Sequence, residues 1–231
     1  MNRRRFLGAI ATGSTVSAAG CLGGLLDEMT TFAASPATVS ADALEEAGYD
    51  DGGTEELVEE REFAGETVEV TNYASEYYRT IELPGLDPLE AGVFATIASP
   101  EVGVAGQDFN PLEEMENDEI AEMIQGQYAA LSIGDRVDDR EVETLGTTVS
   151  VTTYEGQAEL VDTETASLGI RPLVDDTLPE EIDPTAMDVL IDIATAKHGD
   201  DHLVLVGIYP DYVPEEDDRV TTLIEGLEHD G

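Results

Sequence analysis

The pattern of hydrophobic and polar residues along the chain predicts strands in some segments and helices in others. A strand is predicted over 66–83, and the apolar run 92–99 predicts a second strand that is buried. The segment 202–209 is the most apolar run of the folded part, so we expect it to be the central strand of the sheet. Further β-structure is predicted over 141–154, where valines stand among threonines, and Glu155-Gly156 is expected to form a turn.

Four segments place apolar residues at helical spacing. These predicted helices are 41–47, 117–131, 184–197 and 215–228. Ser40 and Gly48 are suited to cap the first of them at its two ends, and residues 50–53 (Asp-Asp-Gly-Gly) are expected to form a loop. Strands mixed with four helices predict an α+β fold, in which the helices of a single domain pack on a mostly antiparallel sheet. This pattern is similar to that of the PsbP-like fold.

The N-terminus has the character of an export signal. Three arginines precede a short apolar segment, and a signal peptide needs such a basic start followed by roughly 7–15 apolar residues. The segment is too short and too polar for a spanning helix, which needs about 20 apolar residues. Arg3 and Arg4, followed by Phe6 and Leu7, resemble the twin-arginine signal, which exports proteins that have already folded. A chance basic N-terminus is the alternative.

Cys21 is the only cysteine, and it follows the small residues Ala18, Ala19 and Gly20 in an arrangement that resembles a lipobox. In lipoproteins the signal is cut before such a cysteine, whose thiol then carries lipid. Ala18 departs from that pattern, because a large apolar residue usually stands at its position. The alternative is an ordinary cut near Ala19 and a thiol without lipid. The lipobox interpretation divides the chain into a signal peptide (1–20), a lipid-anchored tether (21–34) and a single acidic domain (35–231).

The charge of the chain indicates its solvent. The sequence has 10 basic and 52 acidic residues, a formal net charge of −42, and Lys197 is its only lysine. Such a domain repels itself in ordinary salt, whereas in molar salt the Debye length falls to about 3 Å and the repulsion is largely screened. Together with the signal, this composition indicates a halophilic archaeon. Nucleic acid is itself a polyanion, so we expect no nucleic-acid partner.

Four segments resemble a group of haloarchaeal surface lipoproteins. They are Ala34–Ser40, Gly48-Tyr49, Phe109–Leu112 and Gly207–Pro210. The resemblance covers most of the chain after Cys21. It implies an exported protein that is anchored to the outer face of the cell membrane. The group is a family of unknown function, so the resemblance implies no activity.

His198 and His202 are a candidate metal site. Imidazoles four residues apart on a helix lie on one face and can bind a metal ion with the help of carboxylates, here Asp200 and Asp201. Gly199 indicates that the predicted helix has already ended, which removes the geometric reason for pairing the two histidines. A solvated acidic loop that leads into the next strand is the alternative.

Tyr73, Tyr77 and Arg79 are a candidate binding surface for a partner protein or a glycan, because aromatic and arginine side chains are enriched at interfaces. The alternative is structural. Tyrosines in strands are common core and cross-strand residues, and Arg79 can pair with nearby acids.

The sequence contains no Gly-x-Ser-x-Gly, no His-Glu-x-x-His and no phosphate-binding loop, and it requires no cofactor. We therefore expect a lipid-anchored extracellular domain that binds an envelope protein or a ligand and is not an enzyme. One alternative is a surface metal-dependent hydrolase that uses carboxylates near His198 and His202. Another is a solute-capture subunit of a transporter.

Overall fold

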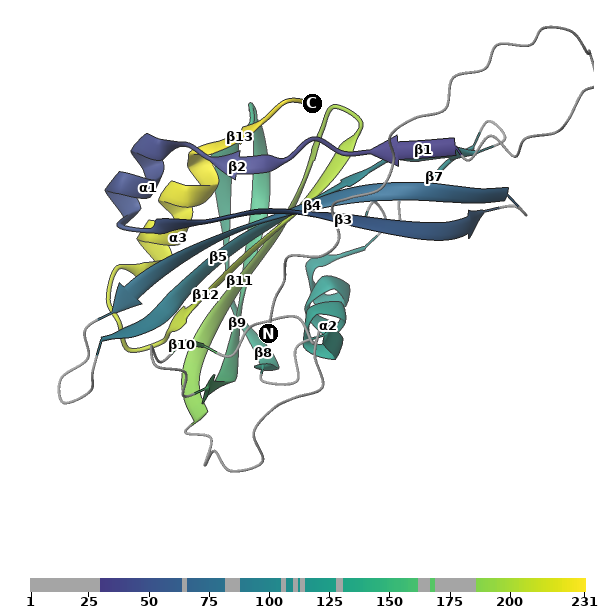
Figure 1. The fold of residues 1–231 in the computed structure, drawn as a ribbon. Coiled ribbons are helices and arrows are strands. Elements are labelled where there is room, and N and C mark those ends of the chain that lie inside the picture. The colour runs from purple at the N-terminus through teal and green to yellow at the C-terminus, as the bar shows by residue number, and fades with distance from the viewer. Residues whose placement is uncertain are drawn as a thin grey trace, which may run out of the picture.

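The computed structural model describes residues 30–63, 66–81, 88–104, 107–109, 112, 115–127, 131–161, 167–168 and 186–231. In this part of the chain it contains thirteen strands and three short helices, arranged around a nine-stranded sheet (Figure 1). The predicted α+β fold is therefore wrong, because the described chain is mainly β. No helix within these residues is long and apolar enough to cross a membrane.

Long antiparallel strands make up most of the sheet. Its strands are β1 (Thr30–Ala33), β3 (Asp50–Phe63), β4 (Glu66–Ile81), β5 (Leu89–Pro100), β8 (Leu131–Thr144), β9 (Thr147–Val161), β10 (Ser167–Leu168), β11 (Ala186–His198) and β12 (Asp201–Pro210). Antiparallel pairs connect them in the spatial order β3, β4, β5, β12, β11, β9, β8. β1 runs parallel to the start of β4, and the short β10 pairs with both β5 and β9.

The remaining elements are short. They are α1 (Ala41–Ala47), α2 (Asn117–Gln127), α3 (Glu216–Glu225), the strand pair β2 (Ala37–Val39) and β13 (Leu227–His229), and the strand pair β6 (Val102–Val104) and β7 (Gln107–Phe109). In Figure 1, α1 and α3 lie side by side with β2 and β13 next to them, whereas α2 stands apart from them.

β12 is the central strand, as its apolar sequence predicted, and all ten of its residues are buried. Successive side chains of a strand point to opposite faces of the sheet, so both faces must be covered here. Leu203, Leu205 and Tyr209 pack on the face covered by α1 and α3. The alternate residues, Val204, Val206 and Ile208, pack on the face covered by α2. The sheet therefore separates two hydrophobic clusters.

Other predicted elements are also confirmed. The strand predicted over 66–83 is β4, and the strand predicted over 92–99 lies within β5. α1 has the predicted bounds, with Ser40 as its N-cap and Gly48 in the left-handed conformation at its C-terminal end. α2 and α3 start at or within one residue of the predicted positions but end earlier, because Leu131 begins β8 and Leu227 begins β13.

The helix predicted over 184–197 is wrong, because residues 186–198 form β11. Val189, Leu190 and Ile193 had suggested helical spacing. In the structure the buried residues instead follow a period of two, and Met187, Val189, Ile191 and Ile193 all belong to the α2-side cluster. β-branched residues favour such a pleated, buried strand. The opposite face of β11 carries Ala194, Ala196 and the buried Asp192.

Two predicted irregular segments are also strands. Residues 50–53 begin β3, where a register shift between Asp51 and Gly53 takes up the irregularity. Glu155-Gly156 lies inside β9, and the hairpin turns instead at Leu145-Gly146, where both φ angles are positive. A Cβ atom at Gly156 would lie 2.5 Å from Ile191 Cδ1, so glycine there permits close packing of β9 against β11 rather than a turn.

Two glycines give a matched test of the packing between α1 and α3. At Gly226 a Cβ atom would lie 2.2 Å from Ala43 Cβ, whereas at Gly126, on α2, it would meet nothing within 4 Å. We expect Gly226→Ala to lower the free energy of unfolding by about 1–3 kcal/mol, because it overpacks this contact. Gly126→Ala should raise it by up to about 1 kcal/mol, through helix propensity. Chemical denaturation in molar salt measures both changes, and equal effects would contradict this account of the packing.

Candidate functional site

Two adjoining hollows lie on the α2 side of the sheet, and we call them together the α2 groove. The larger has a volume of about 420 Å³ and is lined by Met115, Glu116, Asn117, Asp118, Arg136, Ser150, Thr152 and Thr195. The smaller has a volume of about 180 Å³ and is lined by Leu112, Met115, Thr195, Ala196, Lys197, His202 and Leu203. Met115 and Thr195 line both hollows, so the two form one continuous surface.

Hydrogen bonds fix the start of α2 at the edge of this groove. Asn117 Nδ2 donates to Thr152 Oγ1 at 2.9 Å and to the Ser150 carbonyl at 3.2 Å. The Tyr154 hydroxyl donates to Asp118 Oδ1 at 2.5 Å. Burial, followed by this bond to a carboxylate, raises the pKa of Tyr154, so the hydroxyl keeps its proton. The groove is therefore largely preformed, because its two walls are bonded to each other.

Two basic side chains line the groove. Arg136, whose side chain is 51% exposed, donates to Asp139 through two nitrogens, and the hydrogen bonds of this pair raise the pKa of Arg136. Lys197, 46% exposed, donates to Glu101 Oε2 at 2.6 Å, and this bond lowers the pKa of Glu101. Glu116 and Asp118 place negative charge in the same groove. The lining thus offers charges of both signs next to hydroxyl and amide groups.

The other basic side chains that the structure describes form ion pairs with buried carboxylates. Arg140 binds Asp192 through Nη1 and Nη2, at 3.0 and 2.6 Å. Thr153 Oγ1 and the Tyr209 hydroxyl also donate to this carboxylate, at 2.6 and 3.1 Å. Burial alone would lower the pKa of Arg140, but its hydrogen bonds to Asp192 and the charge of Asp192 outweigh burial and raise it. The Asp192 carboxylate therefore has a hydrogen-bond donor from each of three side chains.

A second interior pair lies under the start of α3. Glu216 has a fully buried side chain and accepts a hydrogen bond from Arg79 Nη1, while Arg219 Nε lies 3.5 Å from the same carboxylate oxygen. Burial raises the pKa of Glu216, although both arginines act in the opposite direction. Arg219 also donates to the Ala47 carbonyl at 2.9 Å. These contacts join α1, β4 and α3, so we assign them to the scaffold.

The structure does not bring the predicted metal ligands His198 and His202 together. They stand at the ends of β11 and β12, where Lys197 lies opposite His202 and His198 lies opposite Asp201. Opposite residues of antiparallel strands share a face, so the two histidines point to opposite faces of the sheet. His202 lines the groove, with Nε2 3.9 Å from Glu101 Oε2. Among the described residues, no group of three or more His, Cys, Asp or Glu side chains could hold a metal ion.

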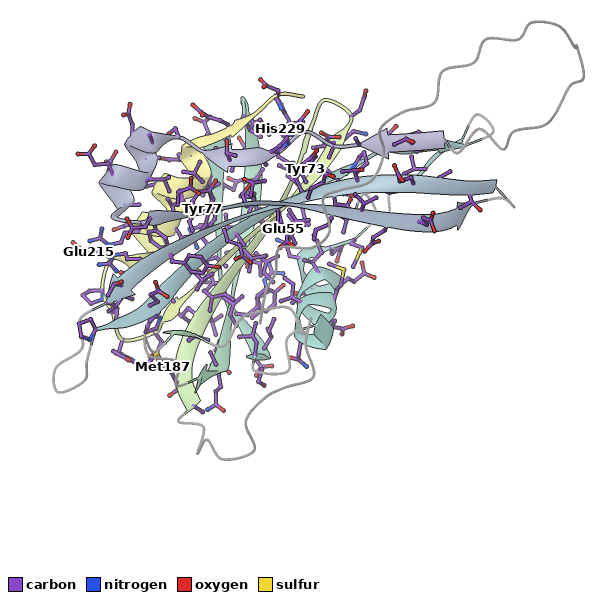
Figure 2. All side chains as sticks on the ribbon, viewed as in Figure 1. Glu55, Tyr73, Tyr77, Met187, Glu215 and His229 are labelled. Carbon is purple, nitrogen blue, oxygen red and sulfur yellow. The ribbon has the colours of Figure 1, made fainter. Side chains whose placement is uncertain are left out.

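His198 instead contacts His229, the last residue of β13. The two Nδ1 atoms are 2.9 Å apart, and the His229 side chain is 0% exposed. His229 Nε2 lies 3.1 Å from Asp201 Oδ2 and 3.2 Å from the Ser35 carbonyl. The Ser35 amide donates to Asp201 Oδ2 at 2.7 Å. Figure 2 labels His229 beside β13, at the edge of the molecule where β2 lies.

The predicted surface of Tyr73, Tyr77 and Arg79 is largely covered. Tyr77 is buried, and its hydroxyl accepts a hydrogen bond from the Val39 amide at 2.8 Å. Arg79 holds Glu216, while Tyr73 packs against the core cluster and donates to Glu56 Oε2 at 3.0 Å. The three side chains share one face of β4, but β2, α1 and α3 lie over that face. Only Tyr73 and Arg79 are left partly accessible.

Sequence reasoning missed most of the α2 groove. Arg136 comes from β8, and Ser150 and Thr152 come from β9, and only the register of this hairpin places them together beside α2. One usable signal was the scarcity of basic residues, since Arg136 stands in an acidic stretch. The predicted export signal (Arg3, Arg4, Phe6 and Leu7) and Cys21 lie outside the described residues.

The two classes of ion pair predict different mutational effects. Arg140→Met leaves Asp192 buried without its partner, so we expect it to lower the free energy of unfolding by about 3–5 kcal/mol. Arg136→Met removes a solvent-exposed pair and should change stability little. Thermal and chemical unfolding in molar salt measure both. Addition of Asp192→Leu to Arg140→Met should recover part of the loss, and a loss of equal size for Arg136→Met would contradict the assignment.

Comparison with known proteins gives a family and no activity. The family model described as "Domain of unknown function (DUF6517)" matches residues 36–228. No curated protein matches the chain. No solved structure matches it either. Because the matched region is most of the sequence and contains every strand of the sheet except β1, the three described helices and the α2 groove, the chain belongs to the DUF6517 family, whose function is unknown.

Proposed function

We propose that this chain is an exported, lipid-anchored domain on the outer face of the cell membrane, and that it binds an envelope protein or a small polar ligand without catalysis. The binding surface in this proposal is the α2 groove. The observation that carries it is the location of Arg136 and Lys197, two exposed basic side chains of a strongly acidic chain, in one preformed groove.

The lining of the groove supports a particular kind of ligand. Arg136 and Lys197 are opposed by Glu116 and Asp118, so the groove has no large excess of positive charge to attract an anion. In molar salt the Debye length is about 3 Å, and long-range attraction is weak in any case. Affinity must then come from short contacts. Asn117, Ser150 and Thr152 supply polar contacts, and the apolar residues that line the groove supply apolar contacts. This combination suits a peptide segment or a polar solute.

The anchor rests on the sequence. Cys21 after three small residues and the arginine pair near the start support lipid attachment after twin-arginine export. Lipid contributes about 0.8 kcal/mol per buried methylene, so two chains retain a protein at a membrane and one barely does. An acidic surface in high salt is consistent with an extracellular location in a halophile.

The anchor gives a direct prediction. Cys21→Ser removes the thiol that would carry lipid, so we expect the protein to move from the membrane fraction to the medium. The measurement is fractionation of cells grown in high salt. Replacement of Arg3 and Arg4 by lysine separates export from lipidation, because it should keep the precursor inside the cell. Membrane retention of Cys21→Ser would contradict the anchor.

The groove is tested by site-specific photocrosslinking in intact cells at growth salt. A benzoylphenylalanine at the exposed Ser150 lies in the groove, whereas the same residue at the exposed Glu45, on α1, lies on the other side of the sheet. We expect a discrete adduct from position 150 and not from position 45. Mass spectrometry of the captured adduct identifies it as a protein or a small ligand.

A second variant connects the adduct to the groove itself. Thr195→Phe places a ring where the two hollows meet, on a strand that tolerates aromatic residues, and should abolish the adduct without unfolding the domain. Identical adducts at positions 150 and 45, or an adduct that survives Thr195→Phe in a folded protein, would refute the α2 groove as the binding surface.

A further inference from the structure

In the cluster of Asp201, His229, His198 and Ser35, the hydrogen-bond acceptors determine which ring nitrogens carry a proton. His229 Nε2 faces two acceptors, Asp201 Oδ2 at 3.1 Å and the Ser35 carbonyl oxygen at 3.2 Å. Neither can donate, since an ionised carboxylate and a carbonyl only accept. The proton of a neutral His229 therefore lies on Nε2, and its Nδ1 has a lone pair.

That lone pair points at His198. The two Nδ1 atoms are 2.9 Å apart, and the ring centroids are 5.2 Å apart with the ring planes at 66°. A centroid separation this much longer than the nitrogen separation means that each Nδ1 faces the other directly along the line between the rings. Because His229 Nδ1 accepts, His198 Nδ1 must donate. The remaining nitrogen of His198, Nε2, is then the unprotonated one, on a half-buried side chain.

We propose that Asp201, His229 and His198 form a directional hydrogen-bonded relay that fixes the position of Ser35. The relay runs from the buried carboxylate to the outer nitrogen of His198, Nε2. It resembles, in chemistry alone, the way a carboxylate fixes the tautomer and orientation of a histidine. Asp201 and His229 together hold Ser35 at both of its backbone polar groups, because Asp201 accepts the Ser35 amide at 2.7 Å while His229 donates to the Ser35 carbonyl.

The location of Ser35 gives the relay its role. Ser35 joins β1 to β2, and β2 pairs with β13, which carries His229. The relay therefore connects the N-terminal strands to the turn between β11 and β12. On the proposed function the lipid lies on Cys21, N-terminal to β1, and β1 itself pairs with β4, so the relay fixes the segment that follows the first described strand of the anchored domain. This role rests on the proposed anchor, whereas the relay itself does not.

The first measurement is the ring tautomer of each histidine in the full-length protein. Long-range ¹H–¹⁵N correlation spectra, recorded at about pH 8, above the ordinary histidine range, distinguish protonated from bare ring nitrogens. We expect His229 to carry its proton on Nε2 and His198 to carry its proton on Nδ1. A His198 ring protonated on Nε2 would overturn the proposal, and no variant is needed to reach that decision.

Two neighbouring variants then separate the relay from general effects of charge. Asp201→Asn removes the negative charge from the group whose Oδ2 faces both the Ser35 amide and His229 Nε2, and so weakens both hydrogen bonds. Asp200→Asn removes the same charge from an exposed side chain in the same turn. We expect Asp201→Asn to change the His198 and His229 tautomer signals and to raise hydrogen exchange at the Ser35 amide by about tenfold or more. Asp200→Asn should do neither.

A third variant tests the direction of the relay. His198→Gln removes the outer member and leaves Asp201, His229 and Ser35 in contact. The Nε2 proton of His229 and the protection of Ser35 should persist. Equal exchange at Ser35 in Asp201→Asn and Asp200→Asn would overturn the proposal. A failed Cys21→Ser release would instead refute the anchor and leave these spectra unaffected.

Discussion

The buried carboxylate of Asp192 is the constraint on which the arrangement of the sheet and α3 depends. An aspartate side chain that is 1% exposed is tolerated only if it is paired and hydrogen-bonded. Arg140 from β8, Thr153 from β9 and Tyr209 from β12 all donate to it from neighbouring strands. Arg140 Nε also donates to Thr221 of α3 at 3.1 Å. One carboxylate on β11 thus sets the register of four strands and the position of a helix.

This use of arginine explains how so acidic a chain stays folded. Among the described residues, Arg79, Arg140 and Arg219 neutralise Asp192 and Glu216 inside the protein, where salt does not screen their attraction. The edge strands β3 and β8 are instead rich in acidic residues, which oppose pairing with another chain. Little positive charge therefore remains at the surface of the described residues, and it is carried by Arg136 and Lys197, which line the α2 groove.

The sequence correctly predicted the elements whose residue pattern fits only one kind of secondary structure. The uniformly apolar run 202–209 and the capped helix 41–47 are examples. β11 was predicted to be a helix, because the spacing of Val189, Leu190 and Ile193 fits a helix as well as a strand. The choice between the two depends on contacts with other strands, such as those of Asp192. The groove and the His229 contacts depend on strand register and on the return of the chain end to β2, which local patterns do not contain.

The turn between β11 and β12 links the two sites through the alternation of strand side chains. Lys197 and His202 are opposite each other and line the α2 groove, while the next pair, His198 and Asp201, belongs to the relay on the other face. A shift of this hairpin by one residue would exchange the two sets. The relay fixes the hairpin against Ser35 and so also fixes one end of the groove. The relay and the proposed binding surface therefore lie at the same end of the sheet, on opposite faces.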